Sequence, residues 1–243
     1  MKIMFIGGDL FGDGGVADYA KLLSEAVQEL GHKTFILSLF RHDNADSAPP
    51  FTPCSTDFLN ISETATWNER IKSGRDAIRR FKPDVISMQF VPFSYQKKGI
   101  LHGEVGKNIS ELLSHIPLHI FFHELHAGLR PSLTCGYFWL GLFQRMFFKR
   151  FILKLNPMLL HTNSSIYIYY TKKMGLNVKK LDLFGNIKVE KPDRNVIFKL
   201  FADRNIPIDS QTRNSFILMG FFGGIQNLAP IELFLQQLKS VKD

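Results

Sequence analysis

Short apolar runs alternate along this chain with longer segments in which apolar residues recur every three or four positions. Recurrence at that spacing indicates amphipathic helices, and the short runs between them indicate buried strands. Alternation of the two is typical of βαβ units, whose strands form a parallel sheet with helices packed on its faces. The sequence therefore predicts an α/β fold with a Rossmann-like parallel sheet flanked by helices.

The predicted elements follow one another closely up to about residue 188, so a first domain is expected over 1–188. Strands are predicted over 2–6, 34–40, 84–90, 118–123, 158–161 and 179–184, and helices over 14–30, 67–81, 108–116, 136–155 and 164–174. The stretch 41–66 carries two adjacent prolines and little periodicity, so a long loop is predicted there.

A second unit follows a polar, proline-containing segment. The sequence predicts a linker region over 189–213 with a short helix at 196–202, and then a strand at 216–222 and a helix at 230–241. One strand and one helix cannot bury both faces of a parallel sheet. We therefore expect 214–243 to be the first strand-helix unit of an incomplete, truncated second Rossmann-like domain.

The composition narrows the class of protein. Hydrophobic residues make up 45% of the 243 residues and include 23 Phe, which is enough to bury a sizeable core. No stretch approaches the roughly 20 apolar residues of a membrane-spanning helix, and the N-terminus lacks the apolar region of a signal peptide. A cytoplasmic location is therefore expected. Cys54 and Cys135 show neither a metal-binding nor a disulfide pattern.

The charge favours anionic partners. The 30 Lys and Arg residues outnumber the 22 Asp and Glu residues, giving a net charge of +8. This excess suits phosphorylated ligands, acidic lipid surfaces or nucleic acid, and does not by itself choose among them. Nucleic acid is not expected as a partner, because no RNA-binding signature or helix-turn-helix spacing is present.

Basic and aromatic residues are interleaved in the predicted helix over 137–155. At 100° per residue its four cations are expected to cover about half of the circumference and to leave the other half apolar. Two interpretations stay open. One is a peripheral membrane contact through 137–155, on the inner face of the plasma membrane, and the other is a sheet-covering helix with a solvated basic face.

A glycine-rich segment over 7–15 joins the first predicted strand to the first predicted helix. Glycines let backbone N–H groups approach a ligand, and the positive end of the helix dipole then faces a phosphate or a hydroxyl-rich group. The segment matches neither GxGxxG nor GxxxxGK[ST], which argues against a standard dinucleotide site and a P-loop nucleotidase. The alternative is a turn whose glycines serve only tight strand-to-helix packing.

Segments spread over nearly the whole chain resemble family 4 glycosyltransferases of the GT-B fold. The opening is similar to the start of that family, with Gly14 and Gly15 at the beginning of a helix and Gly31 and His32 after it. Further resemblances lie in the segments 81–93, 95–99, 121–124, 160–164 and 185–187.

This resemblance implies transfer of a sugar from a nucleotide-sugar donor to a polysaccharide or lipid-linked acceptor with retention of configuration. The nucleotide sugar is a substrate, and no cofactor or metal is implied. The N-terminal half would mainly bind acceptor, with His123 as the catalytic residue near the transferred sugar. The implied substrate-binding residues are Gly12, Gly14, Gly15, Val16 and Glu124.

His123 has other interpretations. It is equally well explained as a partly buried histidine at a strand end that a backbone carbonyl holds. A metal site with Glu124 and His126 is disfavoured, because neighbouring residues on a strand face opposite sides.

The chain also departs from the family. The segment 221–227 has no Arg or Lys where the family has cations, and the family's acidic donor-binding motif has no counterpart. Two interpretations follow. The chain is a glycosyltransferase whose missing donor half a separate chain supplies, or it is a noncatalytic fragment or binding module that has lost that half.

Overall fold

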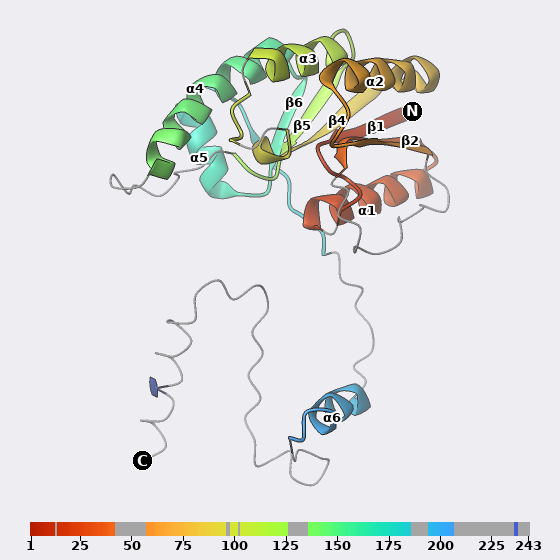
Figure 1. Ribbon diagram of the computed structural model, residues 1–243, viewed down its shortest axis with the longest axis vertical. Helices are drawn as coiled ribbons and strands as arrows, with labels where there is room; N and C mark the ends of the chain where they lie inside the picture. Colours follow the sequence, from red (N-terminus) through yellow and green to blue (C-terminus); the bar gives the residue numbers. More distant parts are fainter. Residues whose placement is uncertain are drawn as a thin grey trace. The chain divides into compact units, whose positions relative to one another are not determined.

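Seven parallel strands form one sheet in the computed structural model (Figure 1). Their order across the sheet is β3-β2-β1-β4-β5-β6-β7. The strands are β1 (Lys2–Gly7), β2 (Lys33–Arg41), β3 (Asp57–Ser62), β4 (Val85–Phe90), β5 (Leu118–Phe122), β6 (Leu159–Thr162) and β7 (Lys179–Lys180). The predicted α/β class with a Rossmann-like parallel sheet is confirmed.

The structure describes residues 1–12, 14–41, 57–95, 98–101, 103–125, 136–185, 194–206 and 236–237. The chain divides into two compact units, Met1–Lys188 and Val189–Asp243. In the second unit, α6 (Arg194–Ala202) is described, and residues 236–237 are helical. The strand predicted at 216–222 and nearly all of the helix predicted at 230–241 lie outside the described residues, so the incomplete second domain stays a prediction.

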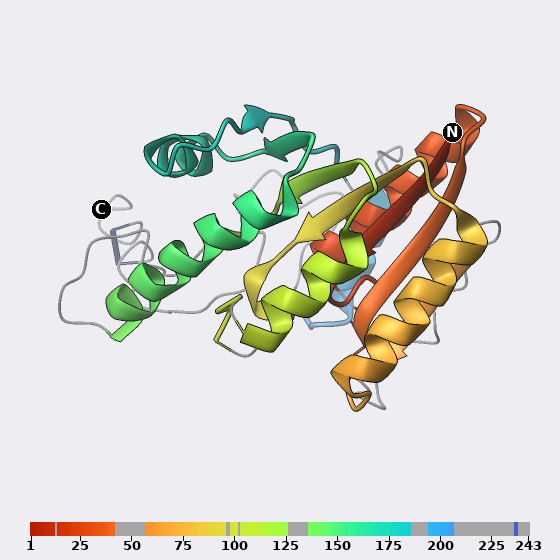
Figure 2. The ribbon, with the colours of Figure 1, turned by 90° about the horizontal axis from the view of Figure 1, so that it is seen from above.

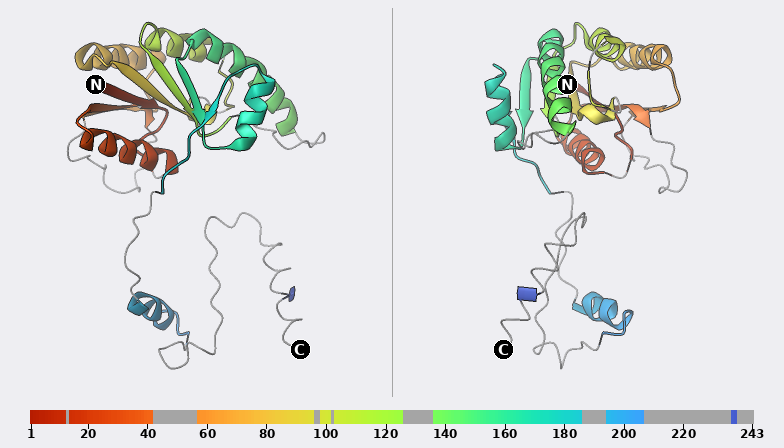
Figure 3. Two further views of the ribbon diagram at one scale, coloured as in Figure 1. Left: turned by 180° about the vertical axis from the view of Figure 1, so that it is seen from behind. Right: turned by 60° about the vertical axis from the view of Figure 1, so that its left-hand side comes forward.

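Helices cover both faces of the sheet in the first unit (Figure 1, Figure 3). One face is covered by α1 (Gly15–Glu29), which packs against β2. The other face is covered by α2 (Trp67–Phe81), α3 (Gly103–Leu113) and α4 (Gly136–Leu155), in which α3 lies between its two neighbours. A short 3₁₀ turn, η1 (Pro92–Ser94), follows β4, and α5 (Ser165–Lys173) joins β6 to β7.

The alternation of side chains along β1 builds two cores. Met4 and Ile6 belong to a large buried cluster that includes side chains of α2, α3 and α4. Phe5 points to the opposite face and joins a smaller cluster with Leu10, Ala20 and Ile36, next to α1. Because successive strand residues face opposite sides, a register slip of one residue would expose both sets.

The bounds predicted for α2 and α4 are confirmed. α2 begins with a capping box, in which the hydroxyl of Thr66 accepts from the Glu69 N–H and the Glu69 carboxylate accepts from the Thr66 N–H. It ends where Lys82 turns into the left-handed region, at φ 52°, just before Pro83. Within the described part of the chain, no helix is long and apolar enough to span a bilayer.

Three other predicted segments differ from the structure, and the differences have physical causes. The loop predicted over 41–66 contains β3, an edge strand whose polar and apolar residues do not alternate cleanly. α3 begins at Gly103 instead of 108, and its glycine at 106 serves close packing, because a Cβ there would lie 2.8 Å from the Leu101 carbonyl oxygen. The strand predicted over 179–184 keeps only two residues, and the chain then leaves the sheet.

Candidate functional site

The order of the strands reverses direction next to β1. From β1 the chain builds outward through β2 and β3 on one side, and β4 to β7 follow on the other. In open parallel sheets a ligand crevice forms outside the carboxyl ends of the strands at such a switch point. The loops after β1 and β4 touch here, since a Cβ on Gly8 would lie 2.1 Å from the Ser94 Cβ. Gly8 is therefore needed for close packing.

The loop after β1 is held by its own polar groups. The Asp9 carboxylate accepts the backbone N–H of Phe11 at 3.0 Å and that of Gly12 at 2.9 Å. Ser38 accepts the Leu10 N–H and donates to the Gly8 carbonyl at 2.8 Å. The Gly12 amide is thus already engaged inside the loop.

The N-terminus of α1 is open. Its N-cap residue is Gly14, which has no side chain to accept the free amides of the first turn. A Cβ added to Gly14 or Gly15 would meet no atom within 4 Å, and neither residue has a positive φ. The fold therefore does not require glycine at these two positions, in contrast to Gly8. What the two glycines provide is access to the positive end of the helix.

A pocket of about 330 Å³ lies beside this helix end. Its lining combines the first turn of α1 with the residues that follow β5 and β7, namely Gly15, Val16, Tyr19, His123, Glu124, Leu183 and Phe184. Tyr19 stacks on Phe184 with ring centroids 4.8 Å apart and meets the His123 ring edge-on at 5.2 Å. The pocket thus has an aromatic wall, a helix N-terminus and one imidazole.

His123 is positioned by the two central strands. Its backbone N–H donates to the Phe90 carbonyl at 3.1 Å, and its Nε2 lies 2.9 Å from Oε1 of the buried Gln89. Burial lowers the pKa of His123 to about 4, so the imidazole is neutral near pH 7. Since the Gln89 carbonyl oxygen can only accept, Nε2 carries the proton and Nδ1 keeps the lone pair.

The hydrogen bonds continue from Gln89 across three strands. Gln89 Nε2 donates to Ser87 Oγ at 2.9 Å, Ser87 Oγ lies 2.9 Å from His119 Nδ1, and His119 Nε2 lies 3.0 Å from His161 Nδ1. In the polarity set by the Gln89 amide, Ser87 donates to His119 and His119 donates to His161. Burial, with a smaller effect of His161, lowers the pKa of His119 to about 4. Burial, with a smaller effect of Lys179, also lowers the pKa of His161 from its ordinary value of 6.5. Near pH 7 the neutral form is therefore favoured at all three histidines of this network.

Four of the predicted site residues meet at this pocket: Gly15, Val16, His123 and Glu124. Gly12 and Gly14 belong to the adjoining loop but do not line the pocket. His126 lies outside the described residues, and within the described part of the chain no three His, Cys, Asp or Glu residues form a metal-binding group. The roles assigned to all of these residues stay predictions.

The sequence analysis missed Tyr19, Gln89 and Phe184 as site residues. Tyr19 is one of the residues that recur at helical spacing in α1, and that spacing by itself indicates only an amphipathic helix. Gln89 did carry a signal, because Ser87 and Gln89 are two polar residues on the same face of an otherwise apolar, buried strand. Polar side chains in such a strand need partners, and here the partners are histidines of the site.

The sequence matches no protein-family model and no curated protein. Its fold is similar to that of a glycosyltransferase from Rickettsia africae, with a TM-score of 0.50, 10% identity and coverage of 86% of this chain and 50% of that one. Two further structures are less similar. One is the lipopolysaccharide outer core galactosyltransferase WaaB, with a TM-score of 0.44, 13% identity and coverage of 74% of this chain and 44% of that one. The other is the UDP-GlcNAc 2-epimerase of Methanocaldococcus jannaschii, with a TM-score of 0.40, 15% identity and coverage of 74% of this chain and 45% of that one.

The chain spans half or less of the length of each of these three structures. At such identities the likeness shows the fold alone. That fold, a Rossmann-like parallel sheet flanked by helices, agrees with the strand order described above.

Proposed function

We propose that this chain is the acceptor-side part of a glycosyltransferase, which moves a sugar from a nucleotide-sugar donor to a glycan or lipid-linked acceptor with retention of configuration. One observation carries the proposal: the pocket that joins the open N-terminus of α1 to a neutral His123 at the carboxyl edge of the sheet. The fold shared with a glycosyltransferase supports it.

The helix end suits the leaving group of such a reaction. When a nucleotide sugar reacts, negative charge grows on the diphosphate as its bond to the anomeric carbon breaks. Preorganised amides aimed at a developing charge are among the strongest catalytic contributions in enzymes. The first-turn amides of α1, which the N-cap residue Gly14 does not cap, are of this kind, and the glycines at 14 and 15 leave the space for a phosphate to approach.

His123 and the aromatic wall suit the sugar itself. A neutral imidazole with a fixed tautomer offers a hydrogen bond of known direction to a sugar hydroxyl and adds no charge that would repel an electron-poor anomeric carbon. Tyr19 and Phe184 present ring surface to the apolar C–H face of a sugar. The volume of about 330 Å³ is at the small end of ligand pockets, which run from about 300 to 1,000 Å³. It suits a sugar ring, so the nucleotide would need a further binding surface.

The test separates binding from transfer. Backbone amide shifts of Gly15 and Val16 should respond to pyrophosphate and to UDP in ¹H–¹⁵N spectra of the chain. Because the proposed function needs a donor-binding half, a transfer assay with UDP-, GDP- and ADP-hexoses and a bacterial lipid extract as acceptor is run with the chain alone and with a protein that supplies that half, and it looks for labelled product. Shifts together with transfer that His123→Ala lowers on the order of a hundredfold would support the proposal.

The control variant is His115→Asn, which changes an exposed histidine in a left-handed turn that Asn tolerates. It should leave both readouts unchanged. Shifts at the α1 end without transfer to any acceptor, even with the donor-binding half supplied, would favour the alternative, a noncatalytic binding module. The absence of any shift with either probe would overturn the assignment of the site.

A further inference from the structure

The outward face of α4 is both apolar and basic. Its buried side is a narrow stripe of Gly141, Gln144, Phe148, Phe151 and Ile152. None of the four cations of the helix lies on this stripe, in line with the predicted apolar side, but the cationic side is not polar throughout. Large apolar side chains also face solvent, with exposed fractions of 59% for Trp139, 51% for Leu142, 54% for Phe143, 42% for Met146 and 58% for Leu153.

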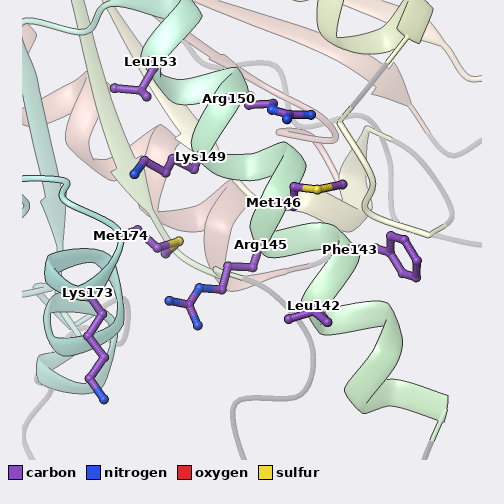
Figure 4. Close-up of a pocket in the computed structure, with 9 residues that line it drawn as sticks. All are labelled: Leu142, Phe143, Arg145, Met146, Lys149, Arg150, Leu153, Lys173 and Met174. Atoms are coloured by element: carbon purple, nitrogen blue, oxygen red, sulfur yellow. The ribbon is translucent and has the colours of Figure 1, made fainter.

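Cations lie among these apolar side chains. A hollow of about 560 Å³ lies along α4 and the end of α5, lined by Leu142, Phe143, Arg145, Met146, Lys149, Arg150, Leu153, Lys173 and Met174. Figure 4 shows Arg145 and Lys149 on the side of α4 that faces α5, with Lys173 and Met174 across from them. We call this region the basic-apolar surface and define it by the exposed Trp139, Leu142, Phe143, Lys149 and Lys173 together with the half-buried Arg145.

No carboxylate from the same part of the sequence offsets these cations. Residues 125–181 contain no Asp or Glu but nine of the 30 Lys and Arg residues. The rest of the chain has 21 cationic and 22 acidic side chains, so the whole positive excess belongs to this segment. Exposed apolar side chains that gather in one patch mark an interaction site, and cations of one sign among them attract an anionic partner.

We infer that the basic-apolar surface binds the face of a membrane that contains anionic phospholipids. Amphipathic helices that lie in a membrane interface combine Lys and Arg with Trp, Phe and Leu, and they bury the apolar groups at the boundary of the acyl chains. Each cation near an anionic surface adds attraction. An acidic protein or a nucleic acid would satisfy the cations but would leave Leu142 and Leu153 without an apolar environment, so a lipid fits the whole set of side chains better.

The basic-apolar surface lies at the same edge of the sheet as the pocket. In the order of the chain α4 is the helix that follows β5, and Figure 2 shows its first half extending beyond the carboxyl ends of the strands. His123 stands at the same edge. Binding of this surface to a membrane would hold the pocket near the headgroups, where a lipid-linked acceptor would be reached. This last step rests on the proposed function, whereas the binding of lipid does not.

Trp139 provides a direct reporter. The chain has only two tryptophans, so Trp67→Phe leaves Trp139 as the single fluorophore. The full chain with this change is mixed with vesicles of phosphatidylcholine alone or with 30 mol% phosphatidylglycerol. We expect a blue shift and quenching by brominated acyl chains with the anionic vesicles only. Unchanged fluorescence together with no co-sedimentation would overturn the inference.

Two triple variants, each of which removes three cations, test which surface binds the membrane. Arg145→Gln, Lys149→Gln and Lys173→Gln together should weaken partitioning onto the anionic vesicles on the order of a hundredfold at low ionic strength. The control removes three exposed cations of α2, by Lys72→Gln, Arg79→Gln and Arg80→Gln, and should change partitioning less than threefold. Equal losses in both variants would mean non-specific attraction, and binding of a single-stranded RNA without binding of vesicles would point to nucleic acid. Either result would overturn the inference, and neither depends on sugar transfer.

Discussion

Nε2 of His123 lies 2.9 Å from Oε1 of Gln89, so a glutamine buried in one strand decides which nitrogen of the pocket histidine carries the proton. Gln89 also donates to Ser87, which connects it to His119 and His161. The tautomer of His123 is thus set by a buried polar network beneath the pocket, and the network can be tested without knowing the substrate.

Gln89→Met should destabilise the fold and release the tautomer of His123. Methionine has a similar size but takes away both hydrogen bonds, which leaves Ser87 and His123 each short of a buried partner. We expect the free energy of unfolding in urea to fall by about 1–3 kcal/mol. In ¹⁵N spectra of the imidazole rings, His123 should change from the Nε2–H form to a mixture of tautomers. A single tautomer in the variant would show that Gln89 does not set it.

The free energy of unfolding should fall as the pH drops below 6.5, the ordinary pKa of a histidine. The pKa values of His119 and His123 are both lowered to about 4 in the folded chain, from 6.5. Between pH 6.5 and 4 the unfolded chain therefore binds protons that the folded chain excludes, which favours unfolding. Above pH 6.5 the effect is absent. Over the full window the loss is on the order of 3 kcal/mol for each histidine.

The measurement is urea unfolding at several pH values between 4.5 and 7.5. His119→Asn removes one of the two titrating groups, so its free energy of unfolding should depend less steeply on pH than that of the unchanged chain. Parallel curves for the two proteins would contradict the assignment of the low pKa to His119.

The fold could be predicted where local signals agree with the tertiary structure. α2 has a capping box, a regular apolar stripe and a proline just after its end, so both of its bounds are readable. β3 was missed because an edge strand buries only part of its surface, and Phe58 stays 43% exposed. Its strand conformation is determined by pairing with β2, a contact between distant segments that no local pattern encodes.

The pocket was predictable only in part. His123 and Glu124 directly follow β5, Gly15 and Val16 begin the helix that follows β1, and the carboxyl ends of parallel strands meet at one edge. Phe184 reaches the same pocket from a segment that was predicted as strand but leaves the sheet after two residues. Its position depends on where the chain turns away from β6, which the sequence does not reveal.

Gly15→Ala should stabilise the chain and weaken anion binding. Alanine is more favourable than glycine in a helix by about 0.5–1 kcal/mol, and the added methyl group meets no atom within 4 Å. In the space beside the first turn, however, it would obstruct a phosphate. We expect a higher melting temperature together with weaker pyrophosphate binding. The binding is measured from the backbone amide shifts in ¹H–¹⁵N spectra.

The contrasting variant is Gly31→Ala. Gly31 ends α1 with a φ of +83°, a conformation that costs alanine about 1 kcal/mol. This change should lower stability and leave pyrophosphate binding intact. Equal pyrophosphate affinity in Gly15→Ala and the unchanged chain would remove the α1 end from the site.

His123 is expected to act in the transition state of sugar transfer. Its ring is neutral, rigidly held and part of the pocket lining, so its hydrogen bond to the sugar needs no reorganisation as the bond to the diphosphate breaks. In an assay with a transferable donor and acceptor, His123→Ala should lower kcat on the order of a hundredfold and change KM for the acceptor little. His123→Asn keeps one donor and one acceptor on a shorter side chain and should restore part of the rate. A variant that raises KM and leaves kcat unchanged would make His123 a residue of uniform substrate binding, because only interactions that strengthen in the transition state raise kcat.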